Sequence, residues 1–169
     1  MFMKGVLRAR GSAADQARRV FVADSFKGFP LAAEADKRVD SDGWFHENGA
    51  FNVDGGGAEV QATFKRYGLW DDGVTILAGY FNDSLPYAAR NGYLDGGLAL
   101  IRMDCDMYRS TMDVLETLYP YLSPGGIVAH NNFEYTAPRS AMVEFRRRHG
   151  LQKLPLHVID DNAVYFVKQ

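Results

Sequence analysis

The chain has 169 residues, and 19 lysine and arginine residues nearly balance 21 aspartate and glutamate residues, for a formal net charge of -2. This balance provides no basic surface for nucleic acid or an anionic membrane, and no apolar run is long enough to span a bilayer. A single cysteine excludes an internal disulfide and fits a reducing compartment, so we expect a soluble, cytoplasmic protein. The length of the chain predicts one domain over residues 1–169.

The first half of the chain predicts two helices, two strands and a long loop. Residues 1–10 have apolar side chains at near-helical spacing, and residues 58–67 show a similar pattern. Short apolar runs at 19–23 and 74–78 predict buried strands. Residues 31–57 are polar and rich in glycine, with interspersed aromatic side chains that include Trp44 and Phe45. Loops of this length are usually functional lids or disordered, and the aromatic side chains favour a lid.

The centre of the chain predicts a strand-helix-strand unit over residues 98–135. An apolar run ends just before Asp104 and Asp106, and a second apolar run ends just before Asn131 and Asn132. A helical pattern separates the two runs, and such crossovers place both strand ends at the same edge of a parallel sheet. We therefore expect Asp104 to neighbour Asn131 or Asn132.

The last part of the chain predicts a helix and a hairpin. Residues 140–149 show helical spacing, and two β-branched runs at 154–159 and 163–168 flank a turn at 160–162. The order of elements favours an α/β fold that ends in an antiparallel hairpin at one sheet edge.

From the residues alone, two interpretations stay open at strand ends. Asp24 follows a predicted strand, where an acidic side chain can bind a ribose or, with Ser25, cap the next turn. Cys105 and His130 follow adjacent strands and could form a thiolate-imidazole pair, although simple packing of Cys105 in a tight turn is the favoured interpretation.

Several long motifs occur in a fixed order. They are VADSFKGFP at 22–30, GYFNDSLP at 79–86, DCDMYRSTMD at 104–113, and LSPGG at 122–126 followed by Asn131 and Asn132. These motifs resemble the TylF/MycF (macrocin-type) O-methyltransferases, and the resemblance covers nearly the entire chain. It implies a Rossmann-like class I methyltransferase sheet, S-adenosylmethionine and Mg²⁺ as cofactors, and a small-molecule glycoside whose sugar hydroxyl is methylated.

The resemblance also implies residues that bind the cofactor. Asp24, with Ser25 beside it, would hold the ribose of S-adenosylmethionine. The stretch that contains Gly79, Phe81 and Asp83 would contact the adenine.

At the central strand ends, the resemblance implies metal and catalytic roles. Asp104, Asn131 and Asn132 would ligate magnesium, and Asp104 or Asp106 would act as the base that removes the hydroxyl proton. The family has two aspartates where this chain has Asn131 and Asn132. Because asparagine carbonyls add no charge to offset dehydration of the ion, we expect magnesium binding to be weak or lost.

The family's glycine-rich cofactor loop has no counterpart in this sequence. The resemblance therefore implies an incomplete domain that lacks the first strand, which would lie between the strands ending at Asp24 and Asp104. We expect those strands to close up, or a homo-oligomer or a complementing chain to supply the missing strand. Such a shortened chain is expected to transfer little or no methyl. The alternatives are a non-catalytic methyltransferase-like binding protein and one half of a hetero-oligomer.

Overall fold

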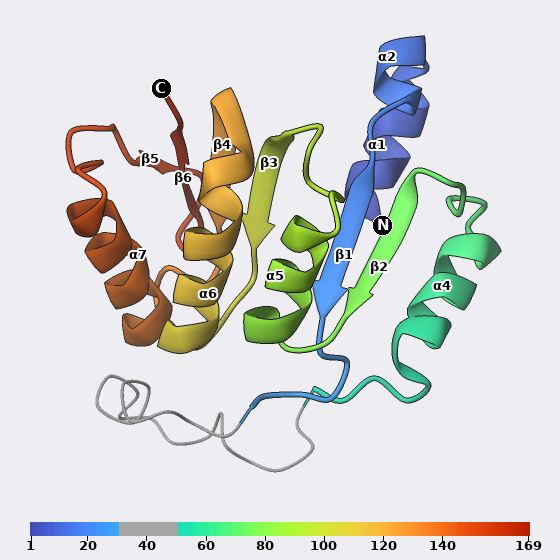
Figure 1. Ribbon diagram of the computed structural model, residues 1–169, viewed down its shortest axis with the longest axis horizontal. Helices are drawn as coiled ribbons and strands as arrows, with labels where there is room; N and C mark the ends of the chain where they lie inside the picture. Colours follow the sequence, from blue (N-terminus) through green and yellow to red (C-terminus); the bar gives the residue numbers. More distant parts are fainter. Residues whose placement is uncertain (31–50) are drawn as a thin grey trace. The chain divides into compact units, whose positions relative to one another are not determined.

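The computed structural model describes residues 1–30 and 51–169. These residues fall into two compact units, one made of residues 1–30 with 51–80 and the other of residues 81–169 (Figure 1). Most of the predicted lid, including Trp44 and Phe45, lies outside the described residues. None of the helices in the two described ranges combines the length and hydrophobicity needed to span a bilayer.

The first unit contains a two-stranded parallel sheet. Its elements are α1 (Phe2–Arg10), α2 (Ala13–Gln16), β1 (Val20–Asp24), α4 (Gly56–Arg66) and β2 (Val74–Ala78). The register runs from Val20 opposite Val74 to Asp24 opposite Ala78, which brings the carboxyl ends of both strands to the same edge. Gly11 ends α1 with a φ of 70°, as its position after the helical pattern predicts. The short helix α2 was not predicted.

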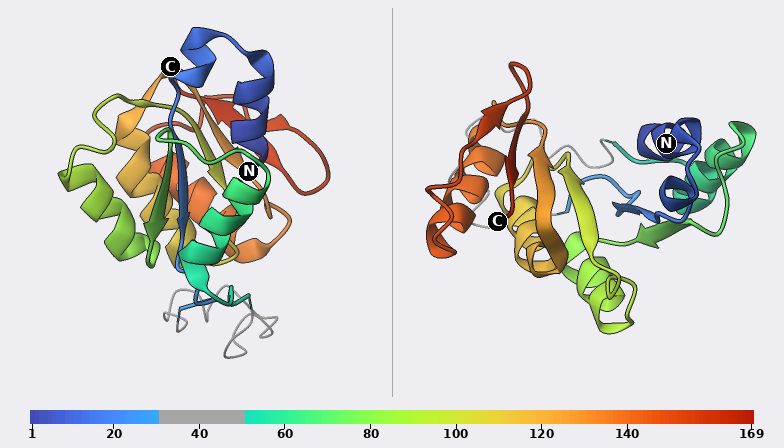
Figure 2. Two further views of the ribbon diagram at one scale, coloured as in Figure 1. Left: turned by 90° about the vertical axis from the view of Figure 1, so that its right-hand side faces the viewer. Right: turned by 90° about the horizontal axis from the view of Figure 1, so that it is seen from above.

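The second unit contains a four-stranded mixed sheet in the order β3-β4-β6-β5. Its elements are α5 (Phe81–Arg90), β3 (Leu98–Met103), α6 (Tyr108–Leu118), the 3-10 helix η2 (Tyr119–Tyr121), β4 (Leu122–His130), α7 (Thr136–Arg148), β5 (His157–Val158) and β6 (Val164–Val167). Strand β3 is parallel to β4, whereas β6 is antiparallel to both β4 and β5. Figures 1 and 2 show α6 and α7 on one face of this sheet, with α5 beside α6. The predicted α/β class and the antiparallel hairpin at the sheet edge are confirmed.

Helix α5 was not predicted, and it contains Pro86 in its interior. Proline lacks the N–H that would bond the carbonyl of Asn82 one turn earlier, so it normally argues against a helix interior. Burial of apolar side chains stabilises the helix despite Pro86. Leu85 and Ala88 lie on one helical face and are 1% and 0% exposed.

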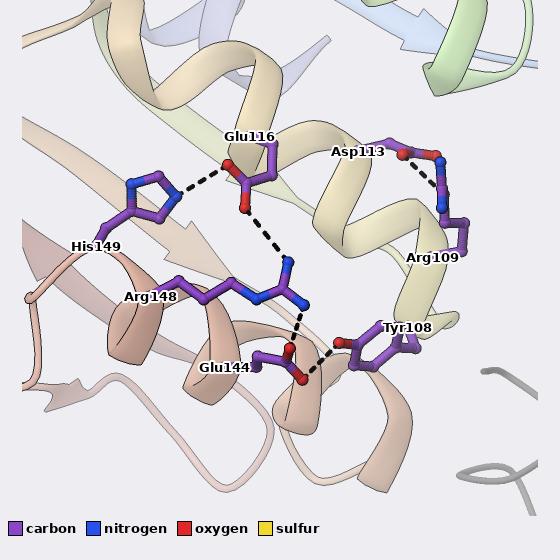
Figure 3. Close-up of polar contacts among 7 residues, drawn as sticks. All are labelled: Tyr108, Arg109, Asp113, Glu116, Glu144, Arg148 and His149. Atoms are coloured by element: carbon purple, nitrogen blue, oxygen red, sulfur yellow. Dashed lines mark hydrogen bonds and ion pairs between the residues drawn. The ribbon is translucent and has the colours of Figure 1, made fainter.

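A chain of polar contacts joins α6 to α7 on the surface of the second unit (Figure 3). The hydroxyl of Tyr108 donates to Glu144 Oε2 at 2.7 Å, and Arg148 pairs with both Glu144 and Glu116. His149 Nε2 lies 2.9 Å from Glu116 Oε2. The hydrogen bond from Tyr108, followed by that from Arg148, lowers the pKa of Glu144. These contacts hold the two helices together beside the last turn of α7.

Strands β1 and β3 belong to different sheets. Within the described residues, β1 pairs only with β2 and β3 pairs only with β4, so each has one side without a neighbouring strand. β1 and β3 therefore do not pair with each other in the part of the chain that the structure describes, and the missing strand stays a prediction.

His130, at the end of β4, is a buried polar residue of the core. It is 0% exposed, and neither ring nitrogen has a hydrogen-bond partner among the described residues. Burial lowers the pKa of His130 to about 4, although the negative charge of Asp104 opposes this shift. The imidazole is therefore neutral in the folded protein at pH 7.

We predict that His130 makes folding stability depend on pH between its folded and ordinary pKa values. Because the folded pKa of about 4 lies below the ordinary histidine pKa of 6.5, the unfolded state binds the proton first as the pH falls. The contribution of His130 to the free energy of unfolding is complete above the ordinary pKa and is lost as the pH falls toward 4. The total change is about 3 kcal/mol. Urea unfolding of wild type and His130→Leu across this range should show a smaller pH slope in the variant.

The exposed His157 provides the control for this measurement. His157→Gln should keep the wild-type slope, because its side chain lies on the surface. A His130→Leu variant with the wild-type slope would show that burial of this imidazole does not govern the pH dependence.

Candidate functional site

The polar ends of β3 and β4 meet at one edge of the four-stranded sheet. The parallel register places Met103 opposite His130, and the Asn131 N–H extends the ladder to the Met103 carbonyl at 2.9 Å. As a result, Asn131 Nδ2 and Asn132 Nδ2 both donate to Asp104 Oδ1, at 2.8 and 3.2 Å. The predicted proximity of Asp104 to both asparagines is confirmed.

Further hydrogen bonds extend this cluster. Asn132 Nδ2 also donates to Asp106 Oδ1, and Asn132 Oδ1 accepts from Asn131 Nδ2 at 3.3 Å and from Asn162 Nδ2 at 3.5 Å. We call these five side chains, Asp104, Asp106, Asn131, Asn132 and Asn162, the amide–carboxylate network. It joins three segments that are far apart in the sequence.

The hairpin turn between β5 and β6 holds one side of the network. The Phe133 N–H donates to the Asn162 carbonyl at 2.9 Å, and Asn132 has a φ of 61°, a conformation that asparagine tolerates well. Sequence reasoning did not include Asn162 in the site. Its place depends on the observed antiparallel register, which sets Val164 opposite His130 and so brings the preceding turn beside Asn132.

Arg102 was also missed. Its Nη1 lies 3.1 Å from Asp104 Oδ2, and the two side chains are 48% and 49% exposed. Side chains two residues apart on an extended chain point the same way, which is the signal that could have suggested this pair. Solvent screens such an exposed ion pair, so it orients the carboxylate more than it stabilises the fold.

The amide–carboxylate network does not fit a resident magnesium ion. Mg²⁺ needs carboxylate and water oxygens in octahedral geometry, whereas Asn131 and Asn132 direct amide protons at Asp104. No group of three or more histidine, cysteine, aspartate or glutamate side chains in the described ranges could hold a metal. The proposed ligands Asp104, Asn131 and Asn132 do come together, but they bond to one another.

The thiolate-imidazole alternative is not supported. Cys105 is 6% exposed and His130 is 0% exposed, so both are packed in the core. Because the His130 ring nitrogens have no hydrogen-bond partner among the described residues, the Cys105 thiol does not bond to them.

In the first unit, Asp24 lies exposed at the carboxyl end of β1. Its Oδ1 accepts the Phe26 N–H at 2.6 Å, and the Ser25 hydroxyl donates to the Gly28 carbonyl at 2.8 Å. The Gly79 N–H donates to the Asp24 carbonyl at 2.9 Å and so closes the ends of β1 and β2 together. Asp24 therefore caps the turn with one oxygen, and its role in binding a ribose stays a prediction.

Phe81 and Asp83 open helix α5 in the second unit. Asp83 is exposed in the first turn, where a negative charge is favourable for the helix dipole, and Phe81 is half-buried. Their role in cofactor binding stays a prediction.

Comparison with known proteins shows the family to which the chain belongs. The family model described as Macrocin-O-methyltransferase (TylF) matches residues 1–168. The chain is 44% identical over 167 residues to the 8-demethyl-8-(2,3-dimethoxy-alpha-L-rhamnosyl)-tetracenomycin-C 4'-O-methyltransferase of Streptomyces olivaceus, covering 98% of this chain and 60% of that protein. It is 40% identical over 167 residues to the Mycinamicin III 3''-O-methyltransferase of Micromonospora griseorubida, covering 98% and 62%.

The fold is similar to a solved structure as well. The O-methyltransferase NovP superimposes with a TM-score of 0.82 and 33% identity, covering 99% of this chain and 65% of NovP. This match confirms the Rossmann-like class I methyltransferase fold that the motifs imply. The chain spans less than two thirds of the length of each of these relatives. On the family match and these identities, the chain belongs to the macrocin O-methyltransferase (TylF) family.

Proposed function

We propose that this chain is an S-adenosylmethionine-dependent O-methyltransferase that acts on a sugar hydroxyl of a natural-product glycoside. The family membership and the names of two relatives, which include a rhamnosyl tetracenomycin methyltransferase, support this assignment. The observation that carries it is the position of Asp104. Its carboxylate is exposed just after the carboxyl end of β3, a strand parallel to β4, and α/β folds bind their ligands at such strand ends.

Asp104 is the proposed base for the acceptor hydroxyl. A carboxylate has about four lone-pair sites, and Asp104 uses three of them for Asn131, Asn132 and Arg102. The remaining lone-pair site can accept the proton of the acceptor hydroxyl as the hydroxyl oxygen attacks the methyl group of the cofactor. Asp106 is the second candidate, but it is less exposed and its Oδ1 already accepts a proton from Asn132. No step passes through a metal, because the network does not fit one.

The cofactor, when bound, would supply an electrophilic methyl group on its sulfonium sulfur. In the first unit, Asp24 would accept a ribose hydroxyl on Oδ2, while Ser25 fixes the turn that follows and Gly79 holds the end of β2. In the second unit, Phe81 and Asp83 are proposed to contact the adenine. These assignments rest on the family motifs and on the exposed Asp24 carboxylate.

A second function, glycoside or partner binding without catalysis, is favoured by one observation. Three internal donors already engage Asp104, as is expected of a carboxylate kept for structure. A homo-oligomer or a complementing chain would fit the same proposal, since β1 and β3 each lack a neighbour on one side within the described residues.

We predict that Asp24→Asn weakens S-adenosylmethionine binding about tenfold, because a charge-assisted hydrogen bond to the ribose becomes a neutral one. Calorimetric titration of the cofactor into wild type and variant measures this effect. Asp72→Asn, an exposed aspartate of the same unit, should keep the wild-type affinity. A folded wild-type protein that binds no cofactor would reject the enzyme assignment for this chain and favour the second function.

We predict that Asp104→Asn lowers methyl transfer about 100-fold or more while the cofactor affinity stays constant, because the base is lost and the binding residues remain. Transfer of labelled methyl to α-L-rhamnosides with a free hydroxyl provides the measurement. Asp106→Asn is the matched variant, and its effect should be smaller. Equal losses in the two variants would show that Asp104 is not the specific base.

A further inference from the structure

We propose that Asn131, Asn132 and Arg102 replace a divalent cation at Asp104, so that the site works without bound magnesium. The same geometry implies that aspartates at positions 131 and 132 would create a cation site. This inference rests on the proposed function for the identity of the reaction site, but cation binding can be measured without cofactor or acceptor.

Hydrogen bonding fixes the orientation of the Asn132 amide. Its Nδ2 donates to Asp104 and Asp106, and its Oδ1 accepts from Asn131 and Asn162. Rotation of the amide by half a turn would point its oxygen at two carboxylates and its nitrogen at two other donors. Both sets of contacts would then be repulsive. The Asn132 oxygen is therefore directed away from the position that a cation between Asp104 and Asp106 would occupy.

Asn131 strengthens this arrangement from the other side. Its Nδ2 bonds both Asp104 Oδ1 at 2.8 Å and Asn132 Oδ1 at 3.3 Å. A cation at Asp104 Oδ1 would have to displace both amide groups from that oxygen. Two amide donors thus occupy the lone pairs that a metal ion needs.

Charge leads to the same conclusion. Within the network only Asp104 and Asp106 are acidic, and the Arg102 guanidinium already lies 3.1 Å from Asp104 Oδ2. Magnesium releases its water reluctantly and needs anionic ligands in compensation. The positive charge of Arg102 and the amide dipoles give Asp104 the neutralisation that the ion would otherwise provide, without any dehydration of a metal.

The exchange of asparagine for aspartate is a sharp test because it changes charge with almost no change in shape. Asn132 adopts a φ of 61°, and aspartate tolerates this left-handed conformation about as well as asparagine. The double variant Asn131→Asp with Asn132→Asp would place four carboxylates at the two strand ends. That set matches the oxygen ligands that Mg²⁺ and Mn²⁺ prefer.

The experiment titrates Mn²⁺ into the full chain and follows free Mn²⁺ by electron paramagnetic resonance, with Mg²⁺ competition. We expect the double variant to bind one Mn²⁺ at least about tenfold more tightly than wild type. Gln152→Glu with Gln169→Glu adds the same charge outside the network and should behave as wild type. Equal Mn²⁺ affinity in wild type and the double variant would overturn the proposal.

A second measurement uses wild type alone, so it remains decisive if the double variant fails to fold. The side-chain amide resonances of Asn131 and Asn132 should stay sharp with one equivalent of Mn²⁺, because no ion binds beside them. Selective broadening of these two resonances would place the ion in the network and overturn the proposal. Neither readout depends on methyl transfer, so a chain that transfers no methyl but shows these results would contradict the proposed function alone.

Discussion

The parallel register between β3 and β4 is the constraint on which the candidate site depends. It places Met103 opposite His130, so that the next residues of each strand emerge together at one edge of the sheet. The hydrogen bond from the Asn131 N–H to the Met103 carbonyl carries this register one step beyond the strand. A shift by one residue would turn Asp104 to the other side of β3 and separate it from both asparagines.

Burial beneath this edge gives the site a rigid base. His130 and Met103 are 0% and 2% exposed, and they lie directly before the polar residues of the two strands. Keeping an unpaired imidazole in the core is costly, and the cost is limited because the ring stays neutral at its lowered pKa of about 4. A polar edge on an apolar, closely packed layer can hold carboxylate and amide groups in fixed positions without help from a metal ion.

Local patterns predicted the strand ends well, because two apolar runs separated by a crossover helix leave few arrangements for a strand-helix-strand unit. The proximity of Asp104 to Asn131 and Asn132 follows from that alone. Asn162 and Arg102 were missed for a different reason, since their places depend on hairpin register and side-chain direction. Helix α5 was missed because burial of its apolar face outweighs the local penalty of Pro86.

The two sheets have open strand edges, whereas the side chains of the amide–carboxylate network bond to one another. Each of β1 and β3 keeps one side without a strand in the described ranges, and exposed backbone donors and acceptors favour pairing with another strand. The amide–carboxylate network lies on the other side of β3, between β3 and β4, where pairing is already complete. The donors that surround Asp104 Oδ1 come from Asn131 and Asn132, both within the second unit. Addition of a strand at the open side of β3 would therefore leave the hydrogen bonds around Asp104 in place.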